Sequence, residues 1–172
     1  MGSSLKGMVN SYLLLLTTPE EAADLLGFSG LESRVYFRDA VVDSQYQVFK
    51  LGRQWRPRKL CNGIKVYPLD RPSPTREEIY FQAIPPQSTF TAEIVLNGDQ
   101  RDLQLLIASM GAGKYGVKIG RGKDRGYGII KLKDLKVLTL KGSKVEVSNI
   151  LSGAQQIIAG RWNIVKFAFF PR

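Results

Sequence analysis

The segment GSSLKG at residues 2–7 combines residue types that can hold a phosphate group. Ser3 and Ser4 supply hydroxyl donors at the predicted start of a helix, where backbone N–H groups without partners and the helix dipole attract anions. Lys6 adds a positive point charge. An ordinary helix N-cap would use the same residue types, so this segment alone leaves both interpretations open.

A second segment, GRGKDRGYG at residues 120–128, places four glycines among cations. Glycine lets the backbone approach a ligand closely, while Arg121, Lys123 and Arg125 supply positive charge. Tyr127 offers a ring on which a nucleobase could stack. A tight β-hairpin connection whose charges face water would have the same composition, so two interpretations remain here as well.

Positive charge is concentrated in two parts of the chain, whose formal net charge is +10. Residues 50–76 hold eight Lys or Arg against one acid, and residues 114–144 hold ten against two. Clustered cations displace condensed counterions from a phosphate backbone, so nucleic acid is the first candidate partner. A basic surface that only maintains solubility is the alternative.

The composition also excludes some kinds of site. The chain has no histidine, which excludes histidine-dependent ribonuclease chemistry and any zinc site that contains histidine. Cys61 is the only cysteine, so an internal disulfide cannot form. The apolar run at 12–16 is too short for a signal peptide or a membrane span, which predicts a cytoplasmic protein without a membrane partner.

Three carboxylates are candidates for catalysis: Asp39, Asp43 and Asp70. Asp39 lies in a predicted strand, where an ion pair with Arg34 or Arg38 is the expected role. Asp70 lies in the first basic segment, where a loop ion pair is expected. No pair or triad is recognisable, so we predict no catalytic residue, no metal ligand and no cofactor.

Hydrophobic periodicity and turn residues predict a single α+β domain over residues 1–172. The second helix has the clearest boundaries, with Thr18 as N-cap, Pro19 in the first turn and Gly27 as the stop. The predicted helices are 3–16, 19–26, 103–110 and 148–158. The predicted strands are 33–40, 45–50, 79–84, 89–96, 115–119, 127–140 and 162–170.

The stretch from 51 to 76 is rich in proline and glycine and predicts a long loop or a protruding hairpin. Loops of this length in compact domains are usually functional or disordered. Because this one carries Trp55 among its basic residues, we predict a functional insertion.

The order of the predicted elements is α, β, β, α, β, one strand short of the ferredoxin-like βαββαβ unit. Together with this order, five segments resemble the RAMP superfamily: GSSLKG, SRVYFRDA, VYPLDRPSPTREE, IPPQSTFTAEIVL and GRGKDRGYG. In order and spacing they are most similar to the repeated backbone subunit of type III CRISPR effector complexes. The likeness runs from residue 2 to about residue 132.

The resemblance implies a modified RNA-recognition-type ferredoxin domain, copies of which stack along a guide RNA. It implies that Ser3, Ser4 and Lys6 meet the guide backbone, helped by Arg34 or Arg38. It also implies that the segment 120–128 contacts RNA. Residues 51–76 correspond to a thumb-like insertion that separates base pairs between guide and target, and stacking by Trp55 there is our hypothesis.

Family members carry some tens of residues before GSSLKG, including the first strand and a loop whose aspartate supports metal-dependent cutting of target RNA. The resemblance therefore implies that this chain lacks the catalytic aspartate and needs a divalent metal only if its complex cleaves target RNA. The missing strand could come from residues 163–170 or from another chain, and we expect another chain. A third explanation for its absence is a truncated reading frame or a split subunit.

These observations lead to the expectation of a guide-RNA-binding backbone subunit in antiviral defence. Its expected partners are guide RNA, target RNA and other CRISPR effector subunits. One alternative is a metal-dependent target-RNA endoribonuclease completed by a partner fragment. The other is a basic scaffold protein that binds a different polyanion, such as an acidic protein.

Overall fold

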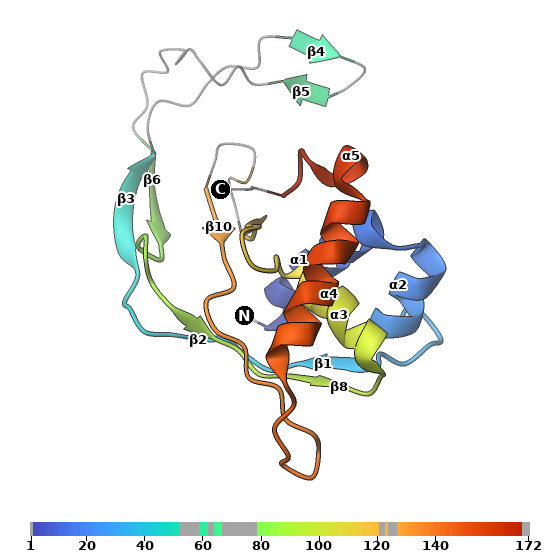
Figure 1. Ribbon diagram of the computed structural model, residues 1–172. Coiled ribbons are helices and arrows are strands. Elements are labelled where there is room, and N and C mark those ends of the chain that lie inside the picture. Colours follow the sequence, from blue (N-terminus) through green and yellow to red (C-terminus); the bar gives the residue numbers. More distant parts are fainter. Residues whose placement is uncertain are drawn as a thin grey trace. The chain divides into compact units, whose positions relative to one another are not determined.

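The computed structural model describes residues 2–51, 59–61, 64–66, 79–120, 123 and 127–169 (Figure 1). The chain divides into two compact units. The first unit comprises residues 1–40 and 92–172, and the second comprises residues 41–91.

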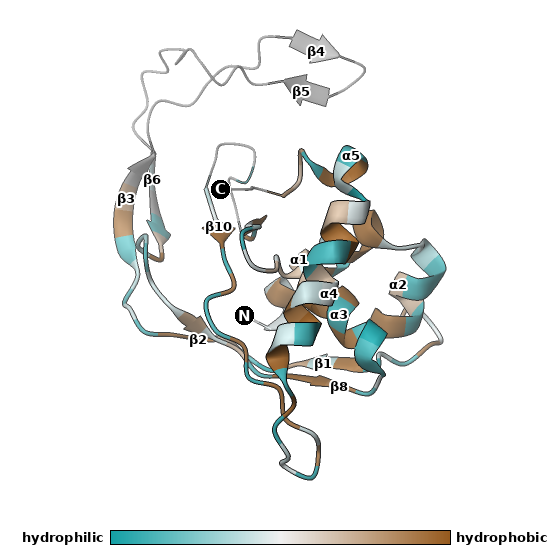
Figure 2. Cartoon of the chain, viewed as in Figure 1, coloured by the Kyte–Doolittle hydropathy of each residue, from teal (hydrophilic) through white to brown (hydrophobic). Residues whose placement is uncertain are grey.

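Five α-helices occur among the described residues of the first unit, and α1 contacts several other elements of it. Helix α1 packs against α2, α3, α5 and strand β1, while α3 packs against α4. Figure 2 shows hydrophobic and hydrophilic residues alternating along α2, α3 and α4. The helices are α1 (Gly2–Leu16), α2 (Pro19–Leu26), α3 (Gln100–Ser109), α4 (Val147–Gly160) and α5 (Trp162–Val165).

Local sequence signals set the ends of α2. The Thr18 hydroxyl accepts the amide of Glu21 at 3.3 Å, and Pro19 occupies the first turn, where its missing N–H costs no hydrogen bond. Gly27 ends the helix with a φ of 74°, in the region that glycine adopts readily. The predicted bounds of this helix are confirmed.

Two short antiparallel ladders complete the first unit. Strand β1 (Val35–Phe37) pairs with β8 (Ile94–Leu96), and the register places Tyr36 opposite Val95. Strand β9 (Val117–Lys118) pairs with β10 (Ile129–Ile130). Among the described residues each ladder has two strands, so a continuous ferredoxin-like sheet stays a prediction.

The described residues of the second unit form three antiparallel strand pairs. Strand β2 (Val41–Val42) pairs with β7 (Phe90–Thr91), and β3 (Gln47–Leu51) pairs with β6 (Ile79–Ala83). Strand β4 (Lys59–Cys61) pairs with β5 (Ile64–Val66) within the predicted thumb-like insertion. Apart from Leu51, which ends β3, the other residues of that insertion lie outside the described residues, Trp55 and Asp70 among them.

The hydrophobic core of the first unit draws on helices, strands and the C-terminal segment. Val9 and Leu13 of α1 have no exposed surface, and neither does Ala108 of α3. Other side chains buried to 2 % exposure or less include Val35, Leu106, Val117, Ile150, Ala154, Ile158, Val165 and Phe169. The core therefore joins segments from both ends of the described chain.

The predicted strand at 162–170 is wrong. Residues 162–165 form helix α5, and the amides of Val165 and Lys166 bond to carbonyls four residues earlier. Val165 and Phe169 are buried, whereas Phe167 is exposed. This spacing fits helical turns rather than the alternation of a strand, so no described residue of 163–169 supplies the strand missing from the ferredoxin-like order.

The predicted strand at 127–140 is also shorter than expected. Only Ile129–Ile130 forms a ladder. Beyond it the chain runs without helix or strand, with Leu132, Leu135 and Val137 packed against the core. The hydrophobic pattern over 132–137 thus reflects one-sided packing. Backbone pairing resumes only where Leu138 forms an isolated antiparallel bridge with Lys144.

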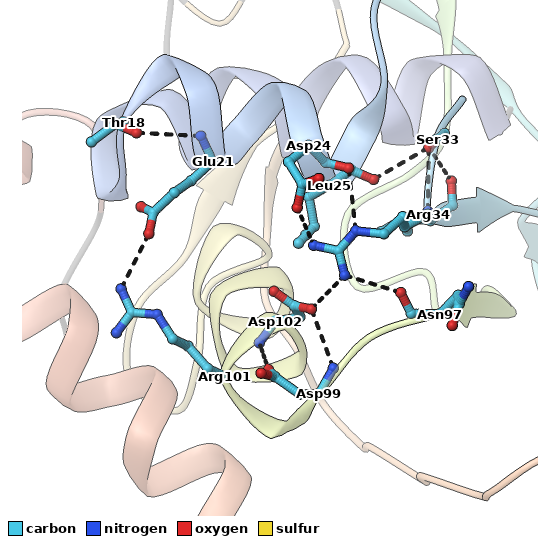
Figure 3. A network of polar contacts seen from close by, with 11 residues as sticks. Thr18, Glu21, Asp24, Leu25, Ser33, Arg34, Asn97, Asp99, Arg101 and Asp102 are labelled. Atoms are coloured by element: carbon cyan, nitrogen blue, oxygen red, sulfur yellow. Dashed lines mark hydrogen bonds and ion pairs between the residues drawn. The ribbon is translucent and has the colours of Figure 1, made fainter. Parts of the chain in front are cut away.

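A polar network centred on Arg34 holds α2, β1 and α3 together (Figure 3). The Arg34 guanidinium pairs with Asp24 of α2 and, at 2.7 Å, with Asp102 of α3, and it donates to the Asn97 carbonyl at 3.2 Å. The hydrogen bond to Asp102 is the main cause that raises the pKa of Arg34. Asp102 and Asp99 also cap α3 reciprocally, each accepting the other's amide.

We expect Asp102→Asn to destabilise the protein by about 1–3 kcal/mol, because it removes a charged partner of Arg34 and weakens the cap of α3. Urea unfolding measures this change. Glu93→Gln is the matched control, because the Arg38–Glu93 pair at 3.1 Å is exposed on both sides. The control should shift the unfolding free energy by about 0.5 kcal/mol or less. Equal effects of the two substitutions would show that the Asp102 interactions stabilise the fold no more than the exposed Arg38–Glu93 pair does.

Candidate nucleic-acid interface

Helix α1 presents one continuous exposed face. Its buried residues recur at helical spacing, and the residues between them are small and mostly polar. The exposed residues, which we call the α1 face, are Ser3, Ser4, Gly7, Asn10, Ser11 and Leu14. Two of the predicted RNA-binding residues, Ser3 and Ser4, therefore face solvent.

One hollow borders the α1 face near its N-terminal end. It measures about 530 Å³ and lies between α1 and the turn that follows α2. We call it the N-terminal hollow. It is lined by Ser3, Lys6, Gly7, Asn10, Leu26, Gly27, Phe28, Leu31 and Ser33. Lys6 makes no ion pair with any acidic side chain that the structure describes, so its charge is available to an anionic ligand.

The turn beside this hollow exposes an aromatic ring that the sequence analysis missed. Phe28 and Leu31 exchange backbone hydrogen bonds of 3.1 and 2.9 Å, which close the turn. The Phe28 side chain is 64 % exposed. An apolar residue directly after the helix-ending Gly27, within the short sequence FSG, was the available signal.

A carboxylate already lies at the start of α1. The Gly2 amide donates to Asp39 Oδ1 at 2.8 Å. Arg34 pairs with Asp24 and Asp102 and Arg38 pairs with Glu93, so the predicted pairing of Asp39 with either arginine is wrong. Because Asp39 occupies this amide, side chains such as Ser3 and Lys6 are the better candidates for phosphate contacts.

Arg34 and Arg38, the two arginines expected to support contacts with the RNA backbone, differ in how readily they could bind a phosphate. Arg34 bonds two carboxylates and two backbone carbonyls, those of Asp24 and Asn97. Its guanidinium therefore serves the polar network of the fold. Arg38 is 67 % exposed and has one exposed partner, Glu93, so a phosphate could compete for it at small cost.

A second hollow, of about 350 Å³, borders the other side of α1, and we call it the C-terminal hollow. It is lined by Met8, Ser11, Tyr12, Leu15, Lys118, Lys123, Phe167 and Ala168. Lys123 belongs to the segment GRGKDRGYG, and its carbonyl accepts a 2.6 Å hydrogen bond from Lys118 Nζ. Helix α1 therefore carries Ser3 and Lys6 at one hollow and meets Lys123 at the other.

The remainder of the segment 120–128 is partly described. Arg121 and Arg125 lie outside the described residues, and the Tyr127 side chain is 40 % exposed. Gly128 has a φ of 74°, and its carbonyl accepts the amide of Ile119 at 2.9 Å. A Cβ at this position would lie 1.9 Å from the Ile119 carbonyl oxygen, so the β9–β10 connection itself requires this glycine.

Several acidic side chains of the first unit are paired within the fold, whereas a group of lysines after β10 is exposed. Asp24 and Asp102 bind Arg34, and Glu21 binds Arg101 at 3.5 Å. In contrast, exposed lysines follow β10, and Leu132, Leu135 and Val137 between them pack against the core. Those lysines are Lys131, Lys133, Lys136, Lys141 and Lys144. None of these lysines forms an ion pair with a described acidic side chain.

No group of three or more potential metal ligands occurs among the described residues. Within the same residues, no helix has the length and apolar character needed to cross a membrane.

Comparison with known proteins gives one family. Residues 1–131 match the sequence model of the RAMP superfamily. This match covers the segments on which the resemblance was based and ends close to residue 132, where the resemblance ended. No curated protein matches the chain.

The exposed Gly7 gives a test of whether the fold itself needs this residue. A Cβ at Gly7 would meet nothing within 4 Å, so we expect Gly7→Ala to raise the unfolding free energy by about 1 kcal/mol through helix propensity alone. Urea unfolding measures it. Gly128→Ala is the opposite case and should destabilise, because its Cβ has no room. Destabilisation by Gly7→Ala would show that the fold depends on glycine there.

Proposed function

Since the chain belongs to the RAMP superfamily, we propose that it is a CRISPR-associated RNA-binding protein that holds guide RNA as a backbone subunit of a type III effector complex. The superfamily itself points to the CRISPR-associated, RNA-binding role. The observation that carries the finer proposal is the α1 face, which exposes Ser3 and Ser4 beside the unpaired Lys6.

In this proposal the protein recognises the RNA backbone rather than its sequence. Lys6 approaches a phosphate as a point charge, and the hydroxyls of Ser3 and Ser4 donate to phosphate oxygens. Gly7 lets the sugar–phosphate chain approach the helix closely, because no side chain covers the backbone there. Phe28 offers a ring for stacking at the edge of the N-terminal hollow.

Contacts with target RNA and with other effector subunits belong to the same proposal. The insertion at 51–76 would separate guide–target base pairs, with Trp55 as the stacking residue. Arg121, Lys123 and Arg125 would meet the RNA backbone from the segment 120–128, and Arg38 and Tyr127 would extend this surface.

We expect Lys6→Ala to weaken binding of single-stranded RNA and to reduce the salt dependence of log K by about 0.7, the value for one lost phosphate contact. Titration of labelled RNA at several salt concentrations measures both quantities. Arg101→Ala is the charge-matched control, because Arg101 is exposed and pairs with Glu21. The control should leave the salt dependence unchanged.

A wild-type protein that binds RNA without salt dependence, or binds no RNA within its assembled complex, would refute the proposed function. Equal effects of Lys6→Ala and Arg101→Ala would show that net charge matters and the α1 face does not.

Gly7→Ala separates stability from RNA binding. We expect this variant to bind RNA more weakly although its fold is more stable, because the added methyl group keeps the RNA backbone away from α1. The same titration measures the affinity at one fixed salt concentration. Unchanged affinity would place the RNA path away from the centre of α1.

A further inference from the structure

The C-terminal hollow exposes a phenylalanine beside a buried one. The Phe167 side chain is 85 % exposed, whereas Phe169 is 1 % exposed. The amides of Ala168 and Phe169 both bond to the Val165 carbonyl, at 2.8 and 3.1 Å. This turn directs one ring into the core and leaves the other at the hollow.

The floor of the hollow is held by one tyrosine. The Tyr12 hydroxyl donates to the Ala168 carbonyl at 3.0 Å and accepts the amide of Lys118 at 2.8 Å. Burial raises the pKa of Tyr12, although the Lys118 amide lowers it in part, so the hydroxyl keeps its donor proton at neutral pH. The Tyr12 ring meets Phe169 edge-on at 4.9 Å between centroids. Three segments are thus fixed around the exposed ring.

The charged residues described at the hollow are lysines. Lys118 and Lys123 line it, and no described acidic residue does. Lys166 Nζ lies 5.3 Å from the centre of the Phe167 ring. A ligand that fits this arrangement has a flat apolar part and a negative charge, which is the chemistry of a nucleotide.

The size and position of the hollow favour a nucleotide of the same RNA chain. Its volume of about 350 Å³ lies at the small end of ligand sites. Ser11 borders it, five residues along α1 from Lys6 at the N-terminal hollow, a separation of about 8 Å along the helix axis. Phe167 also lies beyond the residues 1–131 that match the superfamily.

We propose that the C-terminal hollow binds one nucleotide of single-stranded RNA, whose base stacks on Phe167 and whose phosphate meets Lys118 and Lys123. This inference rests on the proposed function, because it extends the RNA path from the N-terminal hollow along α1. The C-terminal segment thereby supplies a stacking residue that lies outside the matched part of the chain.

The test compares Phe167→Leu with Phe167→Trp. Leucine keeps an apolar side chain without a ring, so affinity for a uridine oligonucleotide should fall about 5-fold or more, while tryptophan should retain the wild-type affinity. Ile164→Ala is the matched control, since Ile164 is an exposed apolar residue of the preceding helix that does not line the hollow. The control should not change the affinity.

An oligonucleotide with abasic positions adds a second readout. The wild-type protein should bind it more weakly than the uridine oligonucleotide of the same length, and Phe167→Leu should reduce this difference. Equal affinities of wild type and Phe167→Leu for uridine RNA would overturn the nucleotide site while leaving the proposed function intact. A wild-type protein that binds no RNA would overturn both.

A change in self-association would also decide the matter. If Phe167→Leu altered the oligomeric state in sedimentation experiments without changing RNA affinity, the hollow would be a contact between copies of the chain, and the nucleotide site would be refuted.

Discussion

Burial of Val9 and Leu13, neither of which has exposed surface, fixes the rotation of α1 about its own axis. Any other rotation would bring polar side chains of the helix into the core, where unpaired hydroxyl and amide groups are costly. The same constraint decides which residues face solvent. Ser3, Ser4 and Gly7 are exposed because their neighbours along the helix are buried, so the candidate RNA surface follows from the packing of the opposite side.

The distribution of charge depends on the same packing. Arg34 draws Asp24 and Asp102 into one network between α2 and α3, so these carboxylates are occupied within the fold. The lysines that follow β10 have no such partners among the described acids. A basic chain can in this way present most of its excess charge on the surfaces where its acidic residues are scarce.

The sequence predicted α2 well because Thr18, Pro19 and Gly27 act through local backbone geometry. It failed at residues 162–170, because a continuous apolar run does not distinguish a strand from a buried helix. The position of Lys123 beside α1 depends on contacts between distant segments, so no local pattern could reveal it. Phe28 was missed for a different reason. Whether an exposed ring can contribute to a binding surface depends on its neighbours in space, and here these include Lys6, which is far away in the sequence.

The two hydrogen bonds of the Tyr12 hydroxyl join residues separated by 106 and 156 positions. Contacts of such long sequence separation form slowly, since a large loop must close before they contribute stability. During synthesis α1 emerges long before Lys118 and Ala168 do. A nascent chain therefore displays α1 without the floor of the C-terminal hollow, and that hollow exists only after translation has passed residue 168.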